Sequence, residues 1–481
     1  MQLVTELQTD RSAGAGRGSR RVSARPARTT YTSPGQDRPQ PRRKTRPAGI
    51  DFRLPLLPTF LIVAVLCSAL FTRHADAATC TLTVHLSADT QPATFRASGF
   101  LHGISASAPS RELVESLRPR LFRTTTRDVG LLDGPGIYER AAAMGAEIQV
   151  DLSSSYGCPA TGPCPGDDGD WSTWDSVIDY LLSARKRKGY RIQWDIWNEP
   201  NLSQYWARDH ERYLEMWRRT VKKIRADDPR SEIVGPSICG YDSEWLYGFL
   251  TWAKSAGVLP DVISWHEFGA PSDIAANAAA LRAFLKRNGI RIKRFSLNEM
   301  VGPHHLTQPG PTACYLWAVE EARIESAAHS CWEDKEDGVV GCGSDSLDGI
   351  LIPNEKKPRA TWWVYRRYAE VSGSLVRVDT CASARGIAGR DDSNKQVAAL
   401  IGRCGQEKVD VRVRFTGLDR VNFFGDRVSV TVERIPDSGW DHLPEPEVVQ
   451  RCVRHLFGGE ITVVVPGIGP SDACFVRLSP T

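Results

Sequence analysis

Short apolar runs alternate with longer amphipathic stretches from about residue 97 to residue 370. Within residues 211–225, for example, apolar side chains recur every three or four positions and form the single stripe of a surface helix. The apolar runs are shorter and end at turn residues, as buried strands do. This alternation predicts an α/β fold in which helices cover a parallel sheet.

Eight apolar runs occur in this region, the number of strands that closes a (β/α)8 TIM barrel. We therefore predict a barrel over residues 97–370. Its strands are expected at residues 98–104, 120–124, 147–152, 191–197, 232–236, 262–267, 294–298 and 327–332. Its helices are expected at residues 111–118, 136–144, 175–188, 211–227, 243–256, 272–288, 311–325 and 360–370.

The period changes after residue 370, where short β-branched runs are separated by Gly, Asp and Pro. Residues 409–415 alternate apolar and charged side chains, which is typical of an antiparallel strand with one face in water. Residues 371–481 are thus predicted to form a smaller antiparallel β-sandwich. Its strands are expected at residues 375–379, 396–401, 409–415, 428–433, 461–465 and 473–478.

The first 53 residues differ from the rest, because they carry twelve Lys or Arg, four acids and many small or polar residues. Such a segment buries too little apolar surface to fold, so residues 1–53 are predicted to be a disordered basic leader. An apolar run at residues 54–71 and the small residues before position 78 predict a signal peptide or signal anchor over residues 54–77. We expect a secreted protein, or else a single-pass anchored one if residues 54–71 stay uncleaved.

The net charge of the whole chain is +4, with 61 basic and 57 acidic residues. Without residues 1–77, 48 basic residues face 52 acidic ones, and the net charge becomes −4. The basic character therefore belongs to the leader, and the folded part gives no electrostatic reason to expect a nucleic-acid partner.

Eleven of the twelve cysteines lie beyond the apolar run, a number and spacing that suit an oxidising compartment. The spacing makes disulfides plausible between Cys158 and Cys164, Cys331 and Cys342, Cys381 and Cys404, and Cys452 and Cys474. Cys80, Cys239 and Cys314 are left over, and at least one thiol should be free or intermolecular because eleven is odd. A zinc site is the rival interpretation, but no paired Cys-x2-Cys motif with histidine spacing occurs, so no metal is expected.

Two segments that end in Asn-Glu carry the clearest chemistry, residues 194–200 and 295–300. Each is a strand-like run, so Glu199 and Glu299 would follow the fourth and seventh barrel strands. Groups at the carboxyl ends of different strands converge at one face of a barrel, and two carboxyl groups held there can cleave a glycosidic bond.

These motifs resemble the clan of retaining glycosidases with an acid/base on strand four and a nucleophile on strand seven. With Ser-Trp-His-Glu-Phe at residues 264–268, the segment 194–201 looks most like family 39, the β-xylosidase and α-L-iduronidase group. The resemblance covers residues 97–370 and implies that Glu199 is the acid/base, that Glu299 is the nucleophile and that Asn198 binds the sugar 2-hydroxyl. It also implies that a strand within residues 78–96 joins the sandwich.

The resemblance further implies a histidine near the nucleophile, which His266 supplies, although a satisfied core histidine is the alternative. Many relatives in the clan carry a tyrosine two positions later that donates to the nucleophile, whereas this chain has Phe268. Its supporting hydroxyl is therefore missing or comes from elsewhere.

Other side chains are candidates for holding the pair or the sugar. Arg123 could bind Glu299, or be a buried structural arginine, and Trp332 could stack on the sugar or be core packing. Trp197 is expected to help wall the site. The two roles require Glu199 to carry a proton and Glu299 to be ionised, so we expect the pKa of Glu199 to be raised by apolar walls and a neighbouring charge.

The predicted function is retaining hydrolysis of an O-glycoside, xyloside-, uronide- or glucoside-like, in a carbohydrate or glycoconjugate, without a cofactor. A non-catalytic carbohydrate-binding or cell-wall protein on the same scaffold is the alternative from another class, and a transglycosylase would share the same residues. The sugar, the linkage, exo or endo action and the oligomeric state remain open at this point.

Overall fold

The fold is seen in a computed structural model that describes residues 79–332, 342–343 and 345–481. All of these residues belong to one compact unit. The predicted leader at residues 1–53 and the predicted signal segment at residues 54–77 lie outside the described residues. Within the part of the chain that the structure describes, no helix combines the length and apolar character needed to cross a membrane.

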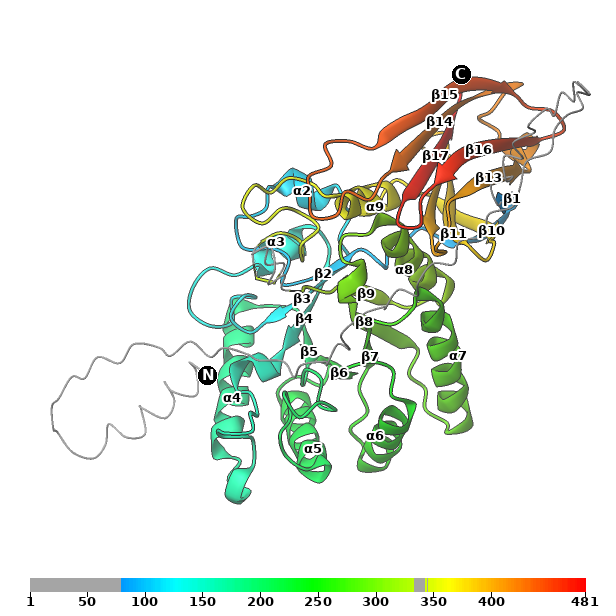
Figure 1. The fold of residues 1–481 in the computed structure, drawn as a ribbon. Coiled ribbons are helices and arrows are strands. Elements are labelled where there is room, and N and C mark those ends of the chain that lie inside the picture. The colour runs from blue at the N-terminus through cyan, green and yellow to red at the C-terminus, as the bar shows by residue number, and fades with distance from the viewer. Residues whose placement is uncertain (1–78, 333–341, 344) are drawn as a thin grey trace, which may run out of the picture. The chain divides into compact units, whose positions relative to one another are not determined.

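Eight parallel strands close into a barrel, as the sequence predicts (Figure 1). Each strand pairs with the next along the chain, and the last pairs with the first. The strands are β2 (Gly99–Leu101), β3 (Leu121–Thr125), β4 (Glu147–Asp151), β5 (Gln193–Asp195), β6 (Glu232–Ile238), β7 (Val262–Glu267), β8 (Arg294–Met300) and β9 (Ser326–His329).

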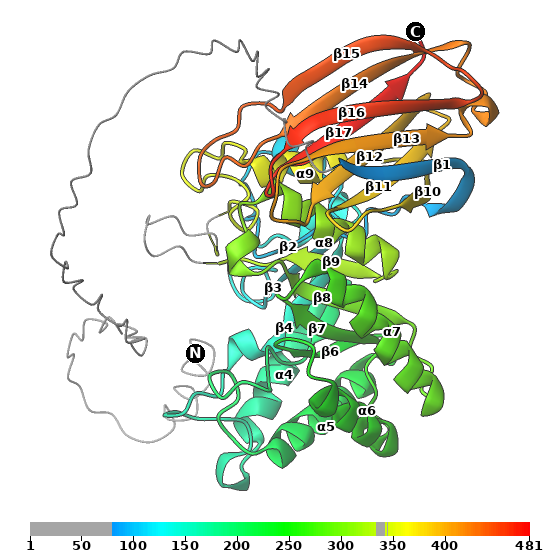
Figure 2. The ribbon, with the colours of Figure 1, turned by 45° about the vertical axis from the view of Figure 1, so that its right-hand side comes forward.

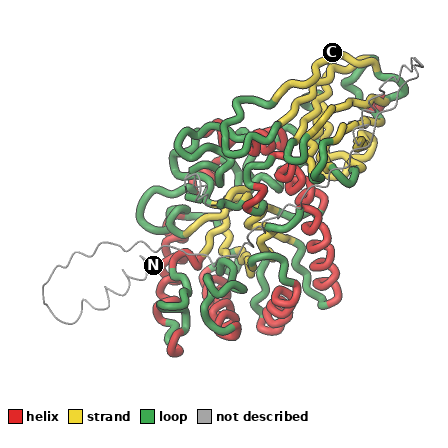
Figure 3. Tube along the Cα trace, in the orientation of Figure 1, coloured by secondary structure: helices red, strands yellow, loops and turns green. Residues whose placement is uncertain are grey.

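Helices surround these strands, as the red tubes around the yellow ones show (Figure 3). Their ends carry local signals: the carboxylates of Asp209 and Asp242 accept from the first turn of α5 and α6, and Gly189 and Gly257 take left-handed conformations after α4 and α6. The helices are α2 (Arg111–Glu115), α3 (Tyr138–Ala143), α4 (Ser172–Lys188), α5 (His210–Asp227), α6 (Ser243–Ala256), α7 (Pro271–Arg287), α8 (Pro309–Glu321) and α9 (Ala360–Tyr368). Short 3-10 helices lie at η1 (Leu152–Ser155), η2 (Asp167–Gly169), η3 (Pro303–His305) and η4 (Leu418–Arg420).

The β-rich part is one nine-stranded sheet in the order β15-β14-β17-β12-β11-β10-β1-β13-β16. It is antiparallel except where β1 runs parallel to β13. Apolar side chains from both ends of the sheet share one core, so the sheet folds over on itself as a sandwich does (Figure 2). The strands are β1 (Thr79–Pro92), β10 (Ser374–Asp379), β11 (Ala384–Asp391), β12 (Gln396–Arg403), β13 (Val409–Thr416), β14 (Arg427–Ile435), β15 (Glu447–His455), β16 (Glu460–Ile468) and β17 (Ala473–Ser479).

Four disulfides form among the described residues, and two of them are the expected pairs, Cys158–Cys164 and Cys331–Cys342. The expected pairs Cys381–Cys404 and Cys452–Cys474 are wrong. Cys381 binds Cys80 because β10 lies beside β1, and Cys404 binds Cys314 because α8 lies on β12. Strand β14 separates Cys452 on β15 from Cys474 on β17, so these two stay free together with Cys239. Four disulfides fit an extracellular protein.

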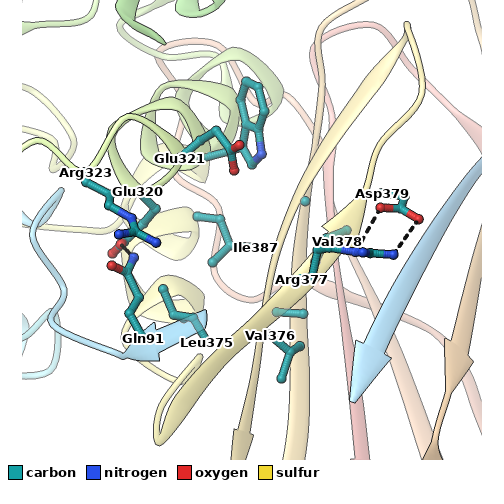
Figure 4. Close-up of a pocket in the computed structure, with 13 residues that line it drawn as sticks. Gln91, Glu320, Glu321, Arg323, Leu375, Val376, Arg377, Val378, Asp379 and Ile387 are labelled. Carbon is teal, nitrogen blue, oxygen red and sulfur yellow. Dashed lines mark hydrogen bonds and ion pairs between the residues drawn. The ribbon is translucent and has the colours of Figure 1, made fainter. Parts of the chain in front are cut away.

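Helix α8 of the barrel packs closely on β12. Gly402 makes this possible, because a Cβ there would lie 2.5 Å from the carbonyl oxygen of Gly310. Beside this contact, a cavity of about 350 Å³ opens between α8 and the strands β10 and β11 (Figure 4). Glu320 and Arg323 lie on its helix side, and Leu375 and Ile387 project from the sheet side.

Candidate active site

Four barrel strands bring the main candidates together at their carboxyl ends. Arg123 lies on β3, His266 on β7 and Glu299 on β8, while Glu199 follows β5. These are the second, sixth, seventh and fourth strands of the barrel. The two glutamates therefore occupy the strands that the sequence predicts for them.

Glu199 is held in an unusual backbone conformation. Its φ of 44° lies in the left-handed region, which costs a non-glycine residue on the order of 1–3 kcal/mol. Its backbone N–H donates to the carbonyl oxygen of Ser237 at 2.9 Å, which fixes this turn against the end of β6. Strain of this kind is characteristic of functional sites.

His266 lies between the two carboxylates. Its Nδ1 is 2.8 Å from Glu199 Oε1, and its Nε2 is 3.7 Å from Glu299 Oε1. Side-chain atoms of all three residues approach one another within 4.8 Å. The imidazole is fully buried, whereas both carboxylates keep a small exposed area, 8% for Glu199 and 14% for Glu299.

Arg123 binds three partners with its guanidinium. Nε donates to Asp195 Oδ2 at 2.8 Å, Nη1 to Glu299 Oε1 at 2.7 Å and Nη2 to Asn198 Oδ1 at 2.8 Å. Only the rigid fork of an arginine reaches three acceptors in this way. Burial alone would lower the pKa of Arg123, but the charges of Asp195 and Glu299 outweigh it and raise this pKa.

A buried polar network holds Asp195, and through it the Arg123 guanidinium, in place. Asp195, on β5, also accepts from the hydroxyl of Ser237 at 2.7 Å and from the amide of Asn298 at 3.1 Å. The amide of Asn298 donates to Ser237 Oγ at 2.9 Å, and Ser237 Oγ lies 2.7 Å from Ser264 Oγ. The sequence pattern does not predict this network, although an aspartate inside the apolar run 194–197 is a signal that points to it.

The pKa of Glu199 is lowered, which is opposite to our expectation. Burial raises this pKa, as expected, but the hydrogen bond and charge of His266, a hydrogen bond from the Cys239 thiol and the charge of Arg123 outweigh the burial. Cys239 was also missed: it follows β6, and burial together with the charge of Glu199 raises the pKa of its thiol to about 12. The side chain of Asn201 fixes Cys239 by bonding to both its backbone N–H and its carbonyl.

The remaining candidates lie in different surroundings. Asn198 is half-buried beside the pair, where its oxygen accepts from Arg123. Trp332 follows β9, donates from Nε1 to the carbonyl of Val301 at 2.9 Å and packs edge-to-face on Phe268 with ring centres 4.9 Å apart. Phe268 itself is 5.7 Å from the His266 ring and brings no hydroxyl to the site.

Trp197 is not brought to the pair. It is fully buried between Trp174 and Trp206, in the layer between strand and helices, and its Nε1 donates to the carbonyl of Tyr205. Strand β5 ends at Asp195 and Glu199 takes a left-handed turn, so the strand rule that residues two positions apart share a face does not relate Trp197 to Glu199. We therefore do not assign Trp197 a contact with the sugar.

Comparison with known proteins gives a family match. The family model for glycosyl hydrolases family 39 matches residues 167–292, a segment that contains Glu199 and His266 and ends before Glu299.

Two curated relatives are glycosidases by name. A 3-O-β-L-arabinopyranosyl-α-L-arabinofuranosidase of Bifidobacterium pseudocatenulatum is 26% identical over 268 residues, which is 51% of this chain and 26% of the relative. A β-xylosidase of Geobacillus stearothermophilus is 32% identical over 106 residues, 21% of each protein. The chain thus spans about a quarter of the length of the curated relatives it matches.

Among solved structures, the family 39 enzyme of Xanthomonas axonopodis pv. citri has the same fold. It superposes with a TM-score of 0.64 at 16% identity and covers 85% of this chain and 99% of its own. The predicted resemblance is confirmed by these findings: residues 167–292 match the family 39 model, and the fold is that of a solved family 39 enzyme.

Proposed function

We propose that the protein is a retaining O-glycoside hydrolase in which Glu199 is the acid/base and Glu299 the nucleophile. The observation that carries the proposal is the approach of their carboxylates within 4.8 Å at the carboxyl ends of β5 and β8. Retaining enzymes hold their carboxyl groups about 5–5.5 Å apart, whereas inverting enzymes leave about 6.5–9.5 Å for a water molecule. The short separation supports retention.

The reaction would proceed in two displacements. Glu299 attacks the anomeric carbon and forms a glycosyl ester, while Glu199 gives its proton to the leaving oxygen. Glu199, now ionised, then takes a proton from water as that water attacks the ester, which releases the sugar and restores Glu299. Arg123 orients the attacking carboxylate through its bond at 2.7 Å.

Because its pKa is lowered, Glu199 must gain a proton before it can act as the acid. Burial favours its protonated form, and the bond from His266 Nδ1 favours the ionised form. A sugar that enters the site displaces water from Glu199, which strengthens the burial contribution. We propose that this change brings the proton onto Glu199 in the complex with substrate.

The proposed substrates are arabinofuranosides or xylosides in carbohydrates or glycoconjugates. The support is the names of the two relatives, an arabinofuranosidase and a β-xylosidase. Asn198 would bind the sugar 2-hydroxyl next to the anomeric carbon, and the indole of Trp332 would face the sugar ring. We also propose that the protein is exported through residues 54–77, or stays anchored by residues 54–71, which agrees with its four disulfides.

The test compares Glu199→Gln and Glu299→Gln with Glu321→Gln, a matched change at an exposed position of α8. On 4-nitrophenyl α-L-arabinofuranoside and β-D-xyloside, we expect kcat/KM to fall by about 10²–10⁴-fold for the two site variants and not for the control. A 2,4-dinitrophenyl leaving group needs no proton, so it should largely rescue the first step in Glu199→Gln and not in Glu299→Gln. If both variants turn over normally, the proposed pair is wrong.

Product stereochemistry checks the mechanism independently. Proton NMR of the first product should show the anomeric configuration of the substrate. An inverted first product would exclude Glu299 as nucleophile.

A non-catalytic carbohydrate-binding protein is the second candidate, favoured by one observation. Phe268 leaves the site without the hydroxyl that relatives in the clan direct at the nucleophile. Calorimetric binding of arabinoxylan fragments, with no turnover of any aryl glycoside by the unmodified protein, would support this candidate over the hydrolase.

A further inference from the structure

Asp151 lies at the mouth of the barrel and has no part in the two displacements described above. It is the last residue of β4, and its register partner on β5 is Asp195, which bonds across the barrel interior to Asn298 on β8. Two residues earlier on β4, the amide of Gln149 donates across the interior to Ser296 Oγ, also on β8. Since alternate residues of a strand share a face, the side chain of Asp151 also points inward, at the end of the barrel where the two glutamates lie.

Only one oxygen of the Asp151 carboxylate is held by the protein. Its Oδ1 accepts from the backbone N–H of Ser153 at 2.9 Å and from Ser153 Oγ at 2.7 Å. Its Oδ2 has no hydrogen-bond partner among the described residues, and the half-buried side chain keeps an exposed area. A fixed carboxylate with one unpaired oxygen is an acceptor that a ligand can satisfy.

Ser153 also joins Asp151 to Asn198, the residue proposed to bind the sugar 2-hydroxyl. The backbone N–H of Asn198 donates to Ser153 Oγ at 3.3 Å. The side chain of Asn198 in turn accepts from Arg123, which bonds to Glu299. Asp151 is therefore two hydrogen bonds from Asn198, on the strand next to β5, and its free oxygen lies on the side of the site where the hydroxyls of the sugar are expected.

The charge of Asp151 determines what its free oxygen can bind. Burial raises the pKa of Asp151 to about 6, against the charge of Arg123, so the carboxylate is still ionised at neutral pH. Arg123 already donates to three acceptors and is not free to pair with another anion. An ionised Asp151 therefore accepts from a sugar hydroxyl, whereas it repels the carboxylate of a uronic acid.

We propose that Asp151 is a specificity-determining residue whose Oδ2 accepts a hydroxyl of the bound sugar and selects neutral pentoses over uronic acids. The inference rests on the proposed function, because it assumes that the sugar lies between Glu199 and Glu299. It narrows the substrate class of that site, since it removes uronides from the candidates.

Asp151→Asn separates recognition of the sugar from support of the fold. Asparagine keeps one oxygen for the two bonds from Ser153 and replaces the free oxygen by an amide nitrogen, which cannot accept. We therefore expect the Tm of this variant to equal that of the unmodified chain. The matched control is Asp179→Asn, an exposed aspartate on α4 that pairs with Lys223.

Calorimetric titration of the full chain with D-xylose and with L-arabinose measures binding without turnover. The Kd of these pentoses should rise about 10–100-fold in Asp151→Asn, because a hydrogen bond to a charged group is lost, and it should stay unchanged in the control. D-glucuronate has the ring of D-xylose with one added carboxylate at C5. The unmodified chain should bind it more weakly than D-xylose, and Asp151→Asn should narrow this difference.

Three results would overturn the inference: a folded Asp151→Asn that binds the pentoses like the unmodified chain, an unmodified chain that binds neither pentose, or one that binds D-glucuronate more tightly than D-xylose. The last comparison needs no variant, so it holds even if Asp151→Asn does not fold. If pentose binding weakens as expected but the unmodified chain hydrolyses no glycoside, only the proposed hydrolysis fails.

Discussion

Single side chains set the geometry of the site, and Arg123 is the one that joins the proposed nucleophile to the buried polar network. Its guanidinium joins Glu299 and Asn198 to the buried carboxylate of Asp195. Arg123 is only 2% exposed. If it were removed, water could not take its place beside the carboxylates of Asp195 and Glu299. We therefore expect Arg123 to position other groups rather than to touch the reacting bond.

Arg123→Lys tests this positioning role. Lysine keeps the charge but is a point donor and cannot reach three acceptors, so the Glu299 carboxylate loses its fixed orientation. We expect kcat/KM to fall about 10²-fold, mainly through kcat, and the Tm to drop as well. Arg96→Lys is the control, because Arg96 pairs with Glu320 far from the pair and its loss should change Tm only. An unchanged kcat in Arg123→Lys would contradict this role.

His266→Gln tests the cause of the low pKa of Glu199. In the unmodified protein, the bond and charge of His266 outweigh burial, so removing the imidazole should let burial raise this pKa. An acid catalyst must be protonated, so the alkaline limb of the kcat/KM–pH profile should move to higher pH. A limb that stays in place or moves to lower pH would contradict this explanation.

The sequence predicts the two glutamates and their strands because glycosidic chemistry needs two carboxyl groups at strand ends. It does not predict which way Glu199 titrates, because burial and His266 act on it in opposite directions and only their geometry decides the balance. Asp195 and Ser237 were missed for a related reason: they contact no expected substrate, and their importance lies in the partners that the barrel brings to them.

Helices and strands follow their hydrophobic period closely, with two exceptions. All eight barrel strands and their helices occur where the pattern predicts them. Strands β11 and β15 were missed because neither has a regular apolar alternation: β11 is rich in alanine and glycine, and β15 is exposed along most of its length. The sequence shows the period of a strand but not its neighbours, which is why two of the four expected disulfides were paired wrongly.

The disulfide Cys314–Cys404 should contribute strongly to stability, because it closes a long loop and fastens α8 to the end of β12. For a separation of 90 residues, the chain-entropy model gives a contribution on the order of 4–5 kcal/mol, against about 2 kcal/mol for the six-residue separation of Cys158–Cys164. We expect the double variant Cys314→Ser/Cys404→Ser to lose more free energy of unfolding in urea than Cys158→Ser/Cys164→Ser. Equal losses would show that loop length does not decide the effect.

The barrel and the sheet form one compact unit, and several side chains join them. Arg367 on α9 donates to Glu433 on β14 at 2.5 Å, and Arg477 on β17 pairs with Glu370 just after α9. Together with the close contact between Gly402 on β12 and Gly310 on α8, these bonds fasten the sheet to α8 and α9, so the sheet stabilises the last two helices of the barrel. The sequence predicts both parts, but not the contacts between them, since these join residues that no local pattern relates.

We therefore expect the folded chain to unfold in a single transition. Differential scanning calorimetry should give equal calorimetric and van't Hoff enthalpies, because loss of the sheet exposes α8 and α9 of the barrel. The same midpoint should appear in near-ultraviolet circular dichroism and in tryptophan fluorescence. Two separate transitions would mean that barrel and sheet are stable independently.

The place of β1 in the sheet has a consequence for synthesis. The segment Thr79–Pro92 is translated before the barrel, yet its two neighbours, β10 and β13, begin at residues 374 and 409 (Figures 1 and 2). An alternating apolar strand must therefore wait, unpaired, while about three hundred residues emerge, and Cys80 must wait equally long for Cys381. Until Cys381 has been made, the other cysteines that follow Cys80 lie nearer to it along the chain. Correct folding therefore requires that β1 and Cys80 stay unpaired until the strands of the sheet have been made.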